Sequence, residues 1–359
     1  MIYYKAVRIF TGSEWVTNRA LLVEDGVILD VVPDNNQYPD AQVIDFGEQL
    51  LVPAFIDLQI YGGNGNLFTM RPTAETIQQT YEEICQQGTA FFQITLSTSS
   101  LDRMIQAIHA CKEYQQQGGK GLIGLHLEGP YINPEKKGAH LEQFVRRPTP
   151  AELNSLFREG EGIITCITFA PEVVDEDCFK LLLQSGIRLS IGHSNATYAQ
   201  ARSAMQQGVR NVTHLFNAMS QLQSRAAGIV GACYDSDVYA SIIADGIHVS
   251  YDALSISKKI MKERLYYISD AVTHSSTDEY SFVRNDDHYV TTQGVLAGSA
   301  LSMYQSVKNG VEKADISWEE SLRMASLYPA RVAGLDHCLG KLEKGYQAEF
   351  AVFELDHHM

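Results

Sequence analysis

The chain has 359 residues, of which 45% are hydrophobic and 20% are charged, a composition typical of a globular protein with a sizeable core. Its 28 basic and 43 acidic residues give a formal net charge of −15, which argues against nucleic acid as a partner because a polyanion would be repelled at long range. No apolar run approaches the roughly 18 to 20 residues that span a bilayer, and the first residues lack the layout of a signal peptide, so we expect a cytoplasmic protein without a membrane partner.

The two ends of the chain are rich in short β-like runs. Near the N-terminus these are Ala20–Val23 and Val27–Val32, and near the C-terminus the run is Glu349–Phe353. Neither end can bury much apolar surface by itself. We therefore expect residues 1–50 and 337–359 to pair in one small β-sandwich domain.

Between these ends, over residues 51–336, short apolar runs alternate with amphipathic helical patterns. The runs are Leu51–Gln59, Phe91–Thr98, Leu122–Glu128, Ile163–Phe169, Ile187–His193, Asn211–Phe216, Tyr239–Asp245 and Leu265–Asp270. Most are continuously apolar, as strands of a parallel sheet are when both faces are covered. Eight strands that alternate with helices predict an α/β fold, the (β/α)₈ TIM barrel, with a doubly wound open sheet as the alternative.

Hydroxyl and glycine residues mark the ends of several expected helices. One helix is expected to begin at Thr73 and stop at Gln86-Gln87-Gly88, and another to begin at Thr197 and stop at Gln206-Gln207-Gly208. A late helix opens at Ser317 with a capping-box pattern.

Polar residues stand where the apolar runs end. They are Asp57 and Gln59 in the first run, Glu128 in the third, His193 in the fifth, His214 in the sixth and Asp270 in the eighth. In a barrel these ends all face the side on which active sites are built. Glu128, His193 and His214 would supply one carboxylate oxygen and two imidazole nitrogens and leave a position for water, as in a catalytic zinc site. Asp270 is then placed to take the proton of that water and pass it to a leaving nitrogen.

Several short motifs in the sequence resemble those of a known family. The motifs are His126–Tyr131, Lys137–His140, Gly192–Tyr198, Thr213–Met219, Ala244–His248, Ser269–Ala271, Leu296–Ala300 and Pro329–Arg331. From about residue 50 to the C-terminus, and in the same order, they resemble the N-acetylglucosamine-6-phosphate deacetylases of the amidohydrolase superfamily.

The resemblance implies an enzyme that hydrolyses N-acetylglucosamine 6-phosphate to glucosamine 6-phosphate and acetate. It implies that Glu128, His193 and His214 bind one divalent metal ion, with zinc expected and iron, manganese and cobalt also compatible. Asp270 would be the general base and then the general acid. The positions that match substrate contacts of the family are Ala139, His140, Asn217, Ala218, Arg225 and His248.

Some of these positions carry a further implied role. Arg225 and His248 would hold the phosphate, with one of these two cations supplied by the neighbouring subunit of a homodimer. His140 would also lie near the carbonyl under attack and stabilise the oxyanion. Ser299 lies in a loop of the family and is given no role.

The first strand departs from the pattern of the superfamily. Most members end this strand with His-x-His, which holds a second metal ion, whereas this chain has Gln59, Ile60 and Tyr61. An amide is a poor zinc ligand beside imidazole, so we expect no second metal ion, and Tyr61 would line the site or press on it. Asp57 is expected to support the end of the strand.

Two alternatives stay open at this point. Another hydrolase of the same superfamily, acting on a different N-acyl or cyclic amide, would keep the metal ligands but need neither Arg225 nor His248. A non-catalytic scaffold without metal is favoured by the missing His-x-His pattern and opposed by the presence of all three metal ligands and Asp270.

Overall fold

A computed structural model describes residues 1–35, 38–277, 279–285 and 288–354. Its main sheet has eight parallel strands in the order β17-β16-β15-β14-β13-β12-β11-β8, so neighbouring strands in the sheet follow one another along the chain. These strands are β8 (Phe55–Ile60), β11 (Thr89–Ser97), β12 (Leu122–Glu128), β13 (Ile164–Phe169), β14 (Arg188–Ile191), β15 (Asn211–Val212), β16 (Tyr239–Ile242) and β17 (Leu265–Tyr267).

The first and last regions of this sheet meet. Ile60 forms a parallel bridge to Ala271, the Tyr61 amide donates to the Ala271 carbonyl at 3.0 Å, and the Asp270 amide donates to the Gln59 carbonyl at 3.0 Å. An open doubly wound sheet has two separate edges, so this contact excludes it. The predicted TIM barrel is confirmed.

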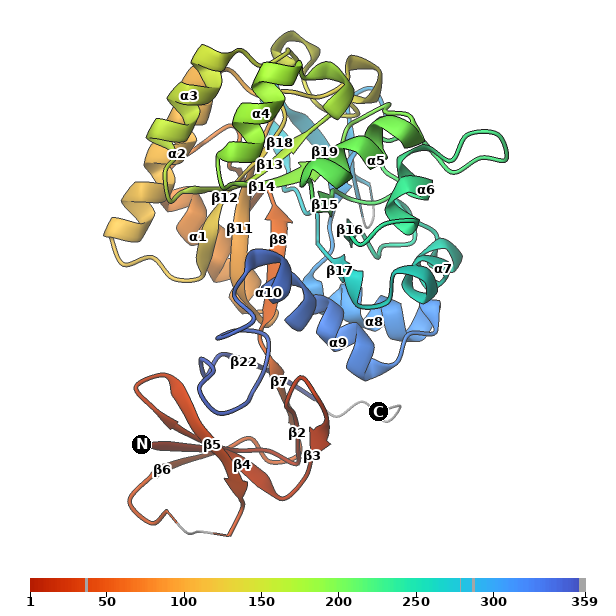
Figure 1. Ribbon diagram of the computed structural model, residues 1–359. Helices are drawn as coiled ribbons and strands as arrows, with labels where there is room; N and C mark the ends of the chain where they lie inside the picture. Colours follow the sequence, from red (N-terminus) through yellow and green to blue (C-terminus); the bar gives the residue numbers. More distant parts are fainter. Residues whose placement is uncertain (36–37, 278, 286–287, 355–359) are drawn as a thin grey trace.

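Helices alternate with the barrel strands and surround them (Figure 1). They are α1 (Ala74–Cys85), α2 (Leu101–Gln116), α3 (Pro150–Glu159), α4 (Glu176–Gln184), α5 (Tyr198–Gln207), α6 (Gly228–Tyr234), α7 (Tyr251–Met261), α8 (Met303–Ala314), α9 (Trp318–Ala325) and α10 (Leu327–Ala333). None of the helices in the described part of the chain combines the length and the apolar composition that crossing a bilayer requires.

The predicted helix ends agree with the observed caps, with one exception. Thr73 and Thr197 cap α1 and α5, and α5 ends at Gly208, which adopts a φ of 127°. Ser317 caps α9 by accepting a hydrogen bond from the Glu320 amide. Glu320 does not complete the expected capping box. Its carboxylate instead binds the side chains of Lys258 and Arg323.

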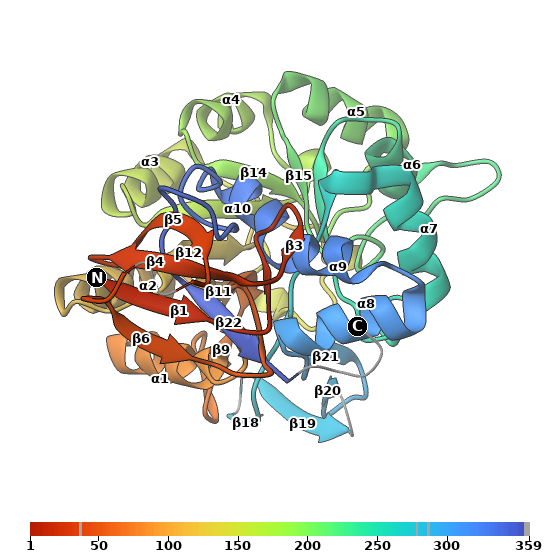
Figure 2. The ribbon, with the colours of Figure 1, turned by 90° about the horizontal axis from the view of Figure 1, so that it is seen from below.

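Both ends of the chain contribute to a small β region below the barrel (Figures 1 and 2). Its strands are β1 (Ile2–Lys5), β2 (Arg8–Phe10), β3 (Trp15–Val16), β4 (Arg19–Glu24), β5 (Val27–Pro33), β6 (Gln42–Asp45), β7 (Leu50–Pro53) and β22 (Phe350–Phe353). They form two four-stranded sheets, β5-β4-β1-β6 and β22-β7-β2-β3. Ile9, Leu21, Ile28, Leu51 and Leu342 are buried in one cluster that joins them.

The predicted first barrel strand, Leu51–Gln59, is in fact two strands. Its first part belongs to β7, which pairs with β2 and β22 in the small β region, and its second part is β8 of the barrel. A continuous apolar run does not reveal this division because both parts are buried. We propose that the small domain comprises residues 51–53 together with the expected 1–50 and 337–359, of which 36–37 and 355–359 lie outside the described residues.

A four-stranded antiparallel sheet follows β17 and was not predicted from the sequence. It consists of β18 (Ser275–Ser276), β19 (Ser281–Asn285), β20 (His288–Thr291) and β21 (Leu296–Ser299), and we call it the cover sheet. Phe282 and Tyr289 of the cover sheet are buried in a cluster with Tyr61 and with Leu67 of the short hairpin formed by β9 (Gly62–Gly63) and β10 (Asn66–Leu67). The cover sheet therefore packs against the carboxyl end of the first barrel strand.

Candidate metal centre

Three of the polar residues expected at strand ends lie just beyond the hydrogen-bonded strands. His193, His214 and Asp270 have φ angles of 46°, 37° and 54°, so all three adopt the left-handed conformation. This conformation costs a residue other than glycine on the order of 1–3 kcal/mol and gathers at functional sites. It also explains why β14, β15 and β17 end earlier than the apolar runs predicted, since the extended backbone stops before these residues.

The carboxyl ends of the barrel strands surround a cavity of about 320 Å³. In Figure 1, strand β8 points away from the small β region, so this cavity opens at the far end of the barrel. The predicted site residues that line it are Tyr61, Glu128, Ala139, His140, His193, His214, Asn217, Ala218, His248 and Asp270. Side chains that are far apart in sequence thus meet at one opening.

Three donor atoms in this cavity form a compact triangle. Oε1 of Glu128 lies 3.0 Å from Nε2 of His214 and 3.3 Å from Nε2 of His193, and the two imidazole nitrogens are 3.1 Å apart. Metal–ligand bonds of about 2.0–2.1 Å in tetrahedral geometry place neighbouring ligand atoms about 3.3 Å apart. The triangle therefore has the size of one face of a tetrahedral zinc site, which fits a divalent ion.

A hydrogen bond from Nδ1, on the far side of the ring from Glu128, orients the imidazole of His193. Its Nδ1 donates to the carbonyl oxygen of Lys136 at 2.8 Å, so Nδ1 carries a hydrogen, and in the neutral ring Nε2 keeps a lone pair that a metal ion can use. An outer hydrogen bond of this kind orients metal-binding histidines in general. Nδ1 of His214 is buried and has no partner among the described residues, so the polar contacts of this ring are made through Nε2.

His140 is a second neighbour of Glu128, and its donor atom lies within 4.8 Å of those of Glu128 and His193. Its Nδ1 accepts a hydrogen bond from the Thr98 backbone amide at 3.3 Å. In the neutral ring the hydrogen is then on Nε2, which lies 3.0 Å from Oε2 of Glu128. Burial, together with the neighbouring His193, lowers the pKa of His140, which keeps the ring neutral. His140 is thus a hydrogen-bond donor in this arrangement.

Glu128 is fully buried yet ionised. Burial by itself would raise the pKa of its carboxyl group, but the imidazoles of His193 and His140 lower it well below the usual range. A buried carboxylate is stable only when it is surrounded by donors or cations. Glu128 has such partners on both oxygens.

Gln59 and Tyr61 occupy the place where the superfamily pattern has His-x-His. Nε2 of Gln59 lies 3.0 Å from Oε1 of Glu128, 2.7 Å from Oδ1 of Asp270 and 2.8 Å from the Tyr61 hydroxyl, which in turn donates to Oε2 of Glu128 at 2.5 Å. Burial and the nearby Glu128 raise the pKa of Tyr61 well above its usual range, so the hydroxyl keeps its proton. An amide and a phenol therefore supply the donors between the two carboxylates.

Asp270 stands beside these groups at the end of β17. Burial raises the pKa of its carboxyl group, against the opposing effect of His214. A carboxyl group whose pKa is raised takes up a proton more readily than an ordinary aspartate does, which suits a general base.

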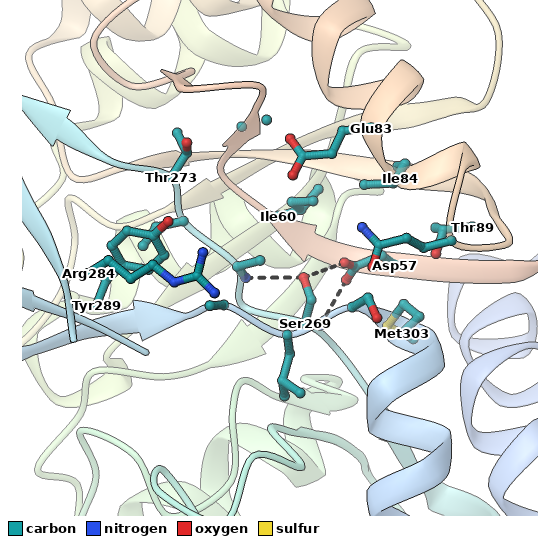
Figure 3. Close-up of a pocket in the computed structure, with 18 residues that line it drawn as sticks. Asp57, Ile60, Glu83, Ile84, Thr89, Ser269, Thr273, Arg284, Tyr289 and Met303 are labelled. Carbon is teal, nitrogen blue, oxygen red and sulfur yellow. Dashed lines mark hydrogen bonds between the residues drawn. The ribbon is translucent and has the colours of Figure 1, made fainter. Parts of the chain in front are cut away.

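Asp57 supports the strand ends from below, as expected. Its Oδ1 accepts hydrogen bonds from the amides of Gln59 and Ser269, both at 3.2 Å, and its Oδ2 accepts one from the Ser269 hydroxyl at 2.5 Å. Figure 3 shows this pair at the edge of a separate cavity of about 130 Å³, with Arg284 and Tyr289 on another wall. Asp57 thus ties the strand end that carries Gln59 to the one that carries Asp270.

His248 lines the cavity and is held by Asp245. Nδ1 of His248 lies 2.5 Å from Oδ2 of Asp245, whose Oδ1 accepts the amides of Ile247 at 2.9 Å and His248 at 2.8 Å. Both side chains are nearly buried. The carboxylate of Asp245 thus orients the imidazole, whose Nε2 points away from Asp245.

Arg225 is not brought into this cavity. It is exposed, in the segment between β15 and α6, which projects away from the barrel in Figure 1. It does not belong to the residues that line the cavity within one subunit.

Several residues that hold the site were not singled out from the sequence. Thr98 orients His140, the Lys136 carbonyl orients His193, and the amide of Ser299 donates to the Asp270 carbonyl at 3.0 Å. Thr98 ends the second apolar run, so a hydroxyl at a strand end was an available signal. The role of the Lys136 carbonyl could not be predicted, because every residue has a backbone carbonyl whatever its side chain.

Comparisons with known proteins identify the family of the chain. The sequence profile of the amidohydrolase family matches residues 50–359. The N-acetylglucosamine-6-phosphate deacetylase of Haemophilus influenzae is 34% identical over 355 residues, which cover 96% of this chain and 93% of that protein. The N-acetylgalactosamine-6-phosphate deacetylase of Escherichia coli O157:H7 is 31% identical over 366 residues, covering 99% and 96%.

Solved structures show the same similarity. The crystal structure of N-acetylglucosamine-6-phosphate deacetylase from Pasteurella multocida superimposes with a TM-score of 0.94 at 34% identity, covering 99% of this chain and 96% of that chain. A mutant N-acetyl-D-glucosamine-6-phosphate deacetylase from Mycobacterium smegmatis, in complex with N-acetyl-D-glucosamine 6-phosphate, gives a TM-score of 0.90 at 25% identity and covers 99% and 95%.

Proposed function

The chain belongs to the amidohydrolase family, and from this premise we propose that it hydrolyses N-acetyl-D-glucosamine 6-phosphate, with water, to D-glucosamine 6-phosphate and acetate. The observation that carries the proposal is the triangle formed by Oε1 of Glu128 and Nε2 of His193 and His214, beside the buried carboxyl group of Asp270. Relatives named for this reaction that match nearly the whole chain support the choice of substrate.

We propose that Glu128, His193 and His214 hold one divalent ion, which we expect to be zinc, although iron, manganese and cobalt also suit these ligands. When bound, such an ion lowers the pKa of a water molecule and polarises the amide carbonyl. Gln59 and Tyr61 fill the position of a second ion with neutral donors, so we expect one equivalent per subunit.

The residues of the chain then carry the proton and the developing charge. Asp270 accepts the proton of the attacking water and delivers it to the departing amine nitrogen. On substrate binding, the acetamide oxygen, where negative charge develops, replaces Oε2 of Glu128 as the acceptor of the Nε2 hydrogen of His140. Asn217 and Ala218, which line the cavity, contact the sugar phosphate together with His248, and Ala139 contacts the sugar.

The first experiment measures acetate release from N-acetylglucosamine 6-phosphate, with and without a chelator. We expect turnover that the chelator abolishes and one divalent ion restores. Unphosphorylated N-acetylglucosamine is the matched control substrate. Equal rates with both substrates would contradict the proposal and favour a different amide substrate, and a protein that binds no metal would favour the non-catalytic alternative.

N-acetylgalactosamine 6-phosphate is the second candidate substrate. The relative from Escherichia coli O157:H7 that is named for this compound is 31% identical over 99% of this chain. Comparing kcat/KM for the two sugar phosphates decides between them.

Because such substrates are charged and do not cross membranes, we propose that the enzyme acts in the cytoplasm.

We also propose a homodimer in which Arg225 reaches the phosphate bound in the other subunit. The loop that carries it projects from the barrel, and the exposed apolar side chains of Leu222 and Ile247, 53% and 40% accessible, lie on that loop and next to His248. Arg225 presents a planar pair of donors suited to phosphate.

Mixed subunits test this arrangement. Arg225→Ala and Asp270→Asn are each expected to be nearly inactive, whereas co-refolded mixtures regain about one quarter of the wild-type activity if the arginine acts across a twofold interface. No recovery in mixed dimers would contradict the arrangement in which Arg225 acts across the interface. A monomer in sedimentation experiments would contradict the dimer.

A further inference from the structure

The two oxygens of Glu128 have different surroundings. Oε1 faces the imidazoles of His193 and His214. Oε2 is reached by the Tyr61 hydroxyl at 2.5 Å and by Nε2 of His140 at 3.0 Å. One oxygen therefore belongs to the metal triangle and the other is surrounded by hydrogen-bond donors.

The direction of the Tyr61 hydrogen bond follows from its neighbours. A carboxylate oxygen only accepts and the Tyr61 hydroxyl keeps its proton, so the hydroxyl is the donor in its contact with Glu128. Oε2 of Glu128 at 2.5 Å is a much nearer acceptor than Oδ1 of Asp270 at 3.4 Å. The short contact marks a charge-assisted bond from the phenol to Glu128.

The Tyr61 side chain is fixed by the rest of the fold. It is 5% exposed, and its ring packs in the cluster that contains Phe282 and Tyr289 of the cover sheet. Its backbone amide donates to the Ala271 carbonyl at 3.0 Å, where the barrel closes. The hydroxyl is therefore held in place from the ring side and from the backbone side.

We propose that Tyr61 is a positioning residue, whose hydroxyl occupies Oε2 of Glu128 and so restricts Glu128 to binding the metal through Oε1 alone. This inference rests on the proposed metal site. A carboxylate that binds through one oxygen leaves coordination positions for water and for the substrate carbonyl, whereas one that binds through both removes a position. Tyr61 thus does more than replace a second metal ligand, since it sets the coordination number of the ion that remains.

The test uses Co²⁺ as the probe in the full-length protein, with Tyr61→Phe as the variant. Loss of an outer-shell partner typically weakens metal binding about 10- to 100-fold, so we expect the dissociation constant for Co²⁺ to rise by that factor. We also expect weaker visible d–d absorption, because Glu128 gains its second oxygen as a ligand and five-coordinate Co²⁺ absorbs less than four-coordinate Co²⁺.

Tyr267→Phe is the matched control. The Tyr267 hydroxyl is also buried and bonds to the Ser321 hydroxyl at 3.1 Å, outside the cavity. We expect this variant to bind Co²⁺ with the affinity and spectrum of the wild type. A Tyr61→Phe spectrum identical to that of the wild type, or equal changes in both variants, would overturn the proposal.

A measurement on the wild type alone removes dependence on how the variant folds. Difference infrared spectra, before and after Co²⁺ addition, report a wide separation of the two carboxylate stretches for binding through one oxygen and a narrow one for binding through both. A narrow separation would overturn the proposal. Wild-type protein that binds Co²⁺ as expected but releases no acetate would refute the proposed function and leave this inference standing, whereas protein that binds no Co²⁺ would refute both.

Discussion

Nε2 of His140 lies 3.0 Å from Oε2 of Glu128, and this hydrogen bond distinguishes His140 from the other histidines of the cavity. By distance alone, His140 would complete a metal site with Glu128 and His193. Its Nδ1, however, already accepts the Thr98 amide, which leaves the hydrogen on the nitrogen that faces Glu128. A protonated nitrogen has no lone pair to offer a metal ion. We therefore expect His214, not His140, to be the third ligand.

The first prediction separates these two histidines. His214→Ala is expected to reduce the bound metal from about one equivalent toward none. His140→Ala is expected to keep the metal and to lower kcat about 10²- to 10³-fold, the usual loss for one oxyanion donor. Elemental analysis and acetate release measure both effects. The opposite pattern, with metal lost only in His140→Ala, would reverse the assignment.

The second prediction concerns proton transfer by Asp270. Asp270→Asn preserves the shape of the side chain but cannot take up a proton at neutral pH. We expect kcat to fall about 10²- to 10⁴-fold while the metal content stays the same. Turnover at the wild-type rate in this variant would show that another group moves the proton.

The third prediction concerns the support of His248 by Asp245. Asp245→Asn removes the charge that holds Nδ1 of His248 at 2.5 Å. A hydrogen bond to a charged group contributes about 1.5–3 kcal/mol, so we expect KM for the phosphorylated substrate to rise at least about tenfold. Hydrolysis of unphosphorylated N-acetylglucosamine, which does not depend on a phosphate contact, serves as the control and should not change. Equal losses for both substrates would indicate a general disturbance of the site.

The fourth prediction concerns stability and pH. Burial raises the pKa of Asp57 from 3.8 to about 6, in spite of the hydrogen bonds from Ser269. The folded protein then binds this proton more tightly than the unfolded chain does. The free energy of unfolding therefore falls as the pH rises from about 4 to about 6, and stays lowered above that range. A difference of about two pH units corresponds to about 3 kcal/mol.

Asp57→Asn removes this titration. Relative to the variant, the wild type should lose up to about 3 kcal/mol of unfolding free energy between pH 4 and pH 7, as measured by urea denaturation across the range. A difference between the two proteins that does not change with pH would show that Asp57 is ionised throughout.

The barrel was predictable from the sequence because apolar runs report burial directly. Strands β12 and β16 begin at the predicted residues, Leu122 and Tyr239. The places where strands end were less visible, since His214 and Asp270 leave the extended conformation through left-handed backbone angles that no residue-type pattern encodes. The polar residues of the site were nevertheless identifiable, because polar side chains at the ends of buried runs need a partner or a function.

The cover sheet and the outer hydrogen bonds of the site were not predictable in the same way. The strands of the cover sheet are short, and Phe282 and Tyr289 become a core only by packing on Tyr61 from the first barrel strand. Likewise, Thr98 reaches His140 across 42 positions of the chain. Such contacts depend on how distant segments meet, and a periodicity read along the chain does not contain that information.

The order of synthesis leaves one edge of strand β7 unpaired until the end of the chain has been made. The strand pairs with β2 on one side, but its other neighbour, β22, begins only at Phe350. At about 5–20 residues per second, a ribosome needs roughly 15 to 60 s to add the intervening chain. During that interval the apolar stretch Leu50–Pro53 is a nascent strand with one open edge, to which another unfinished chain can pair.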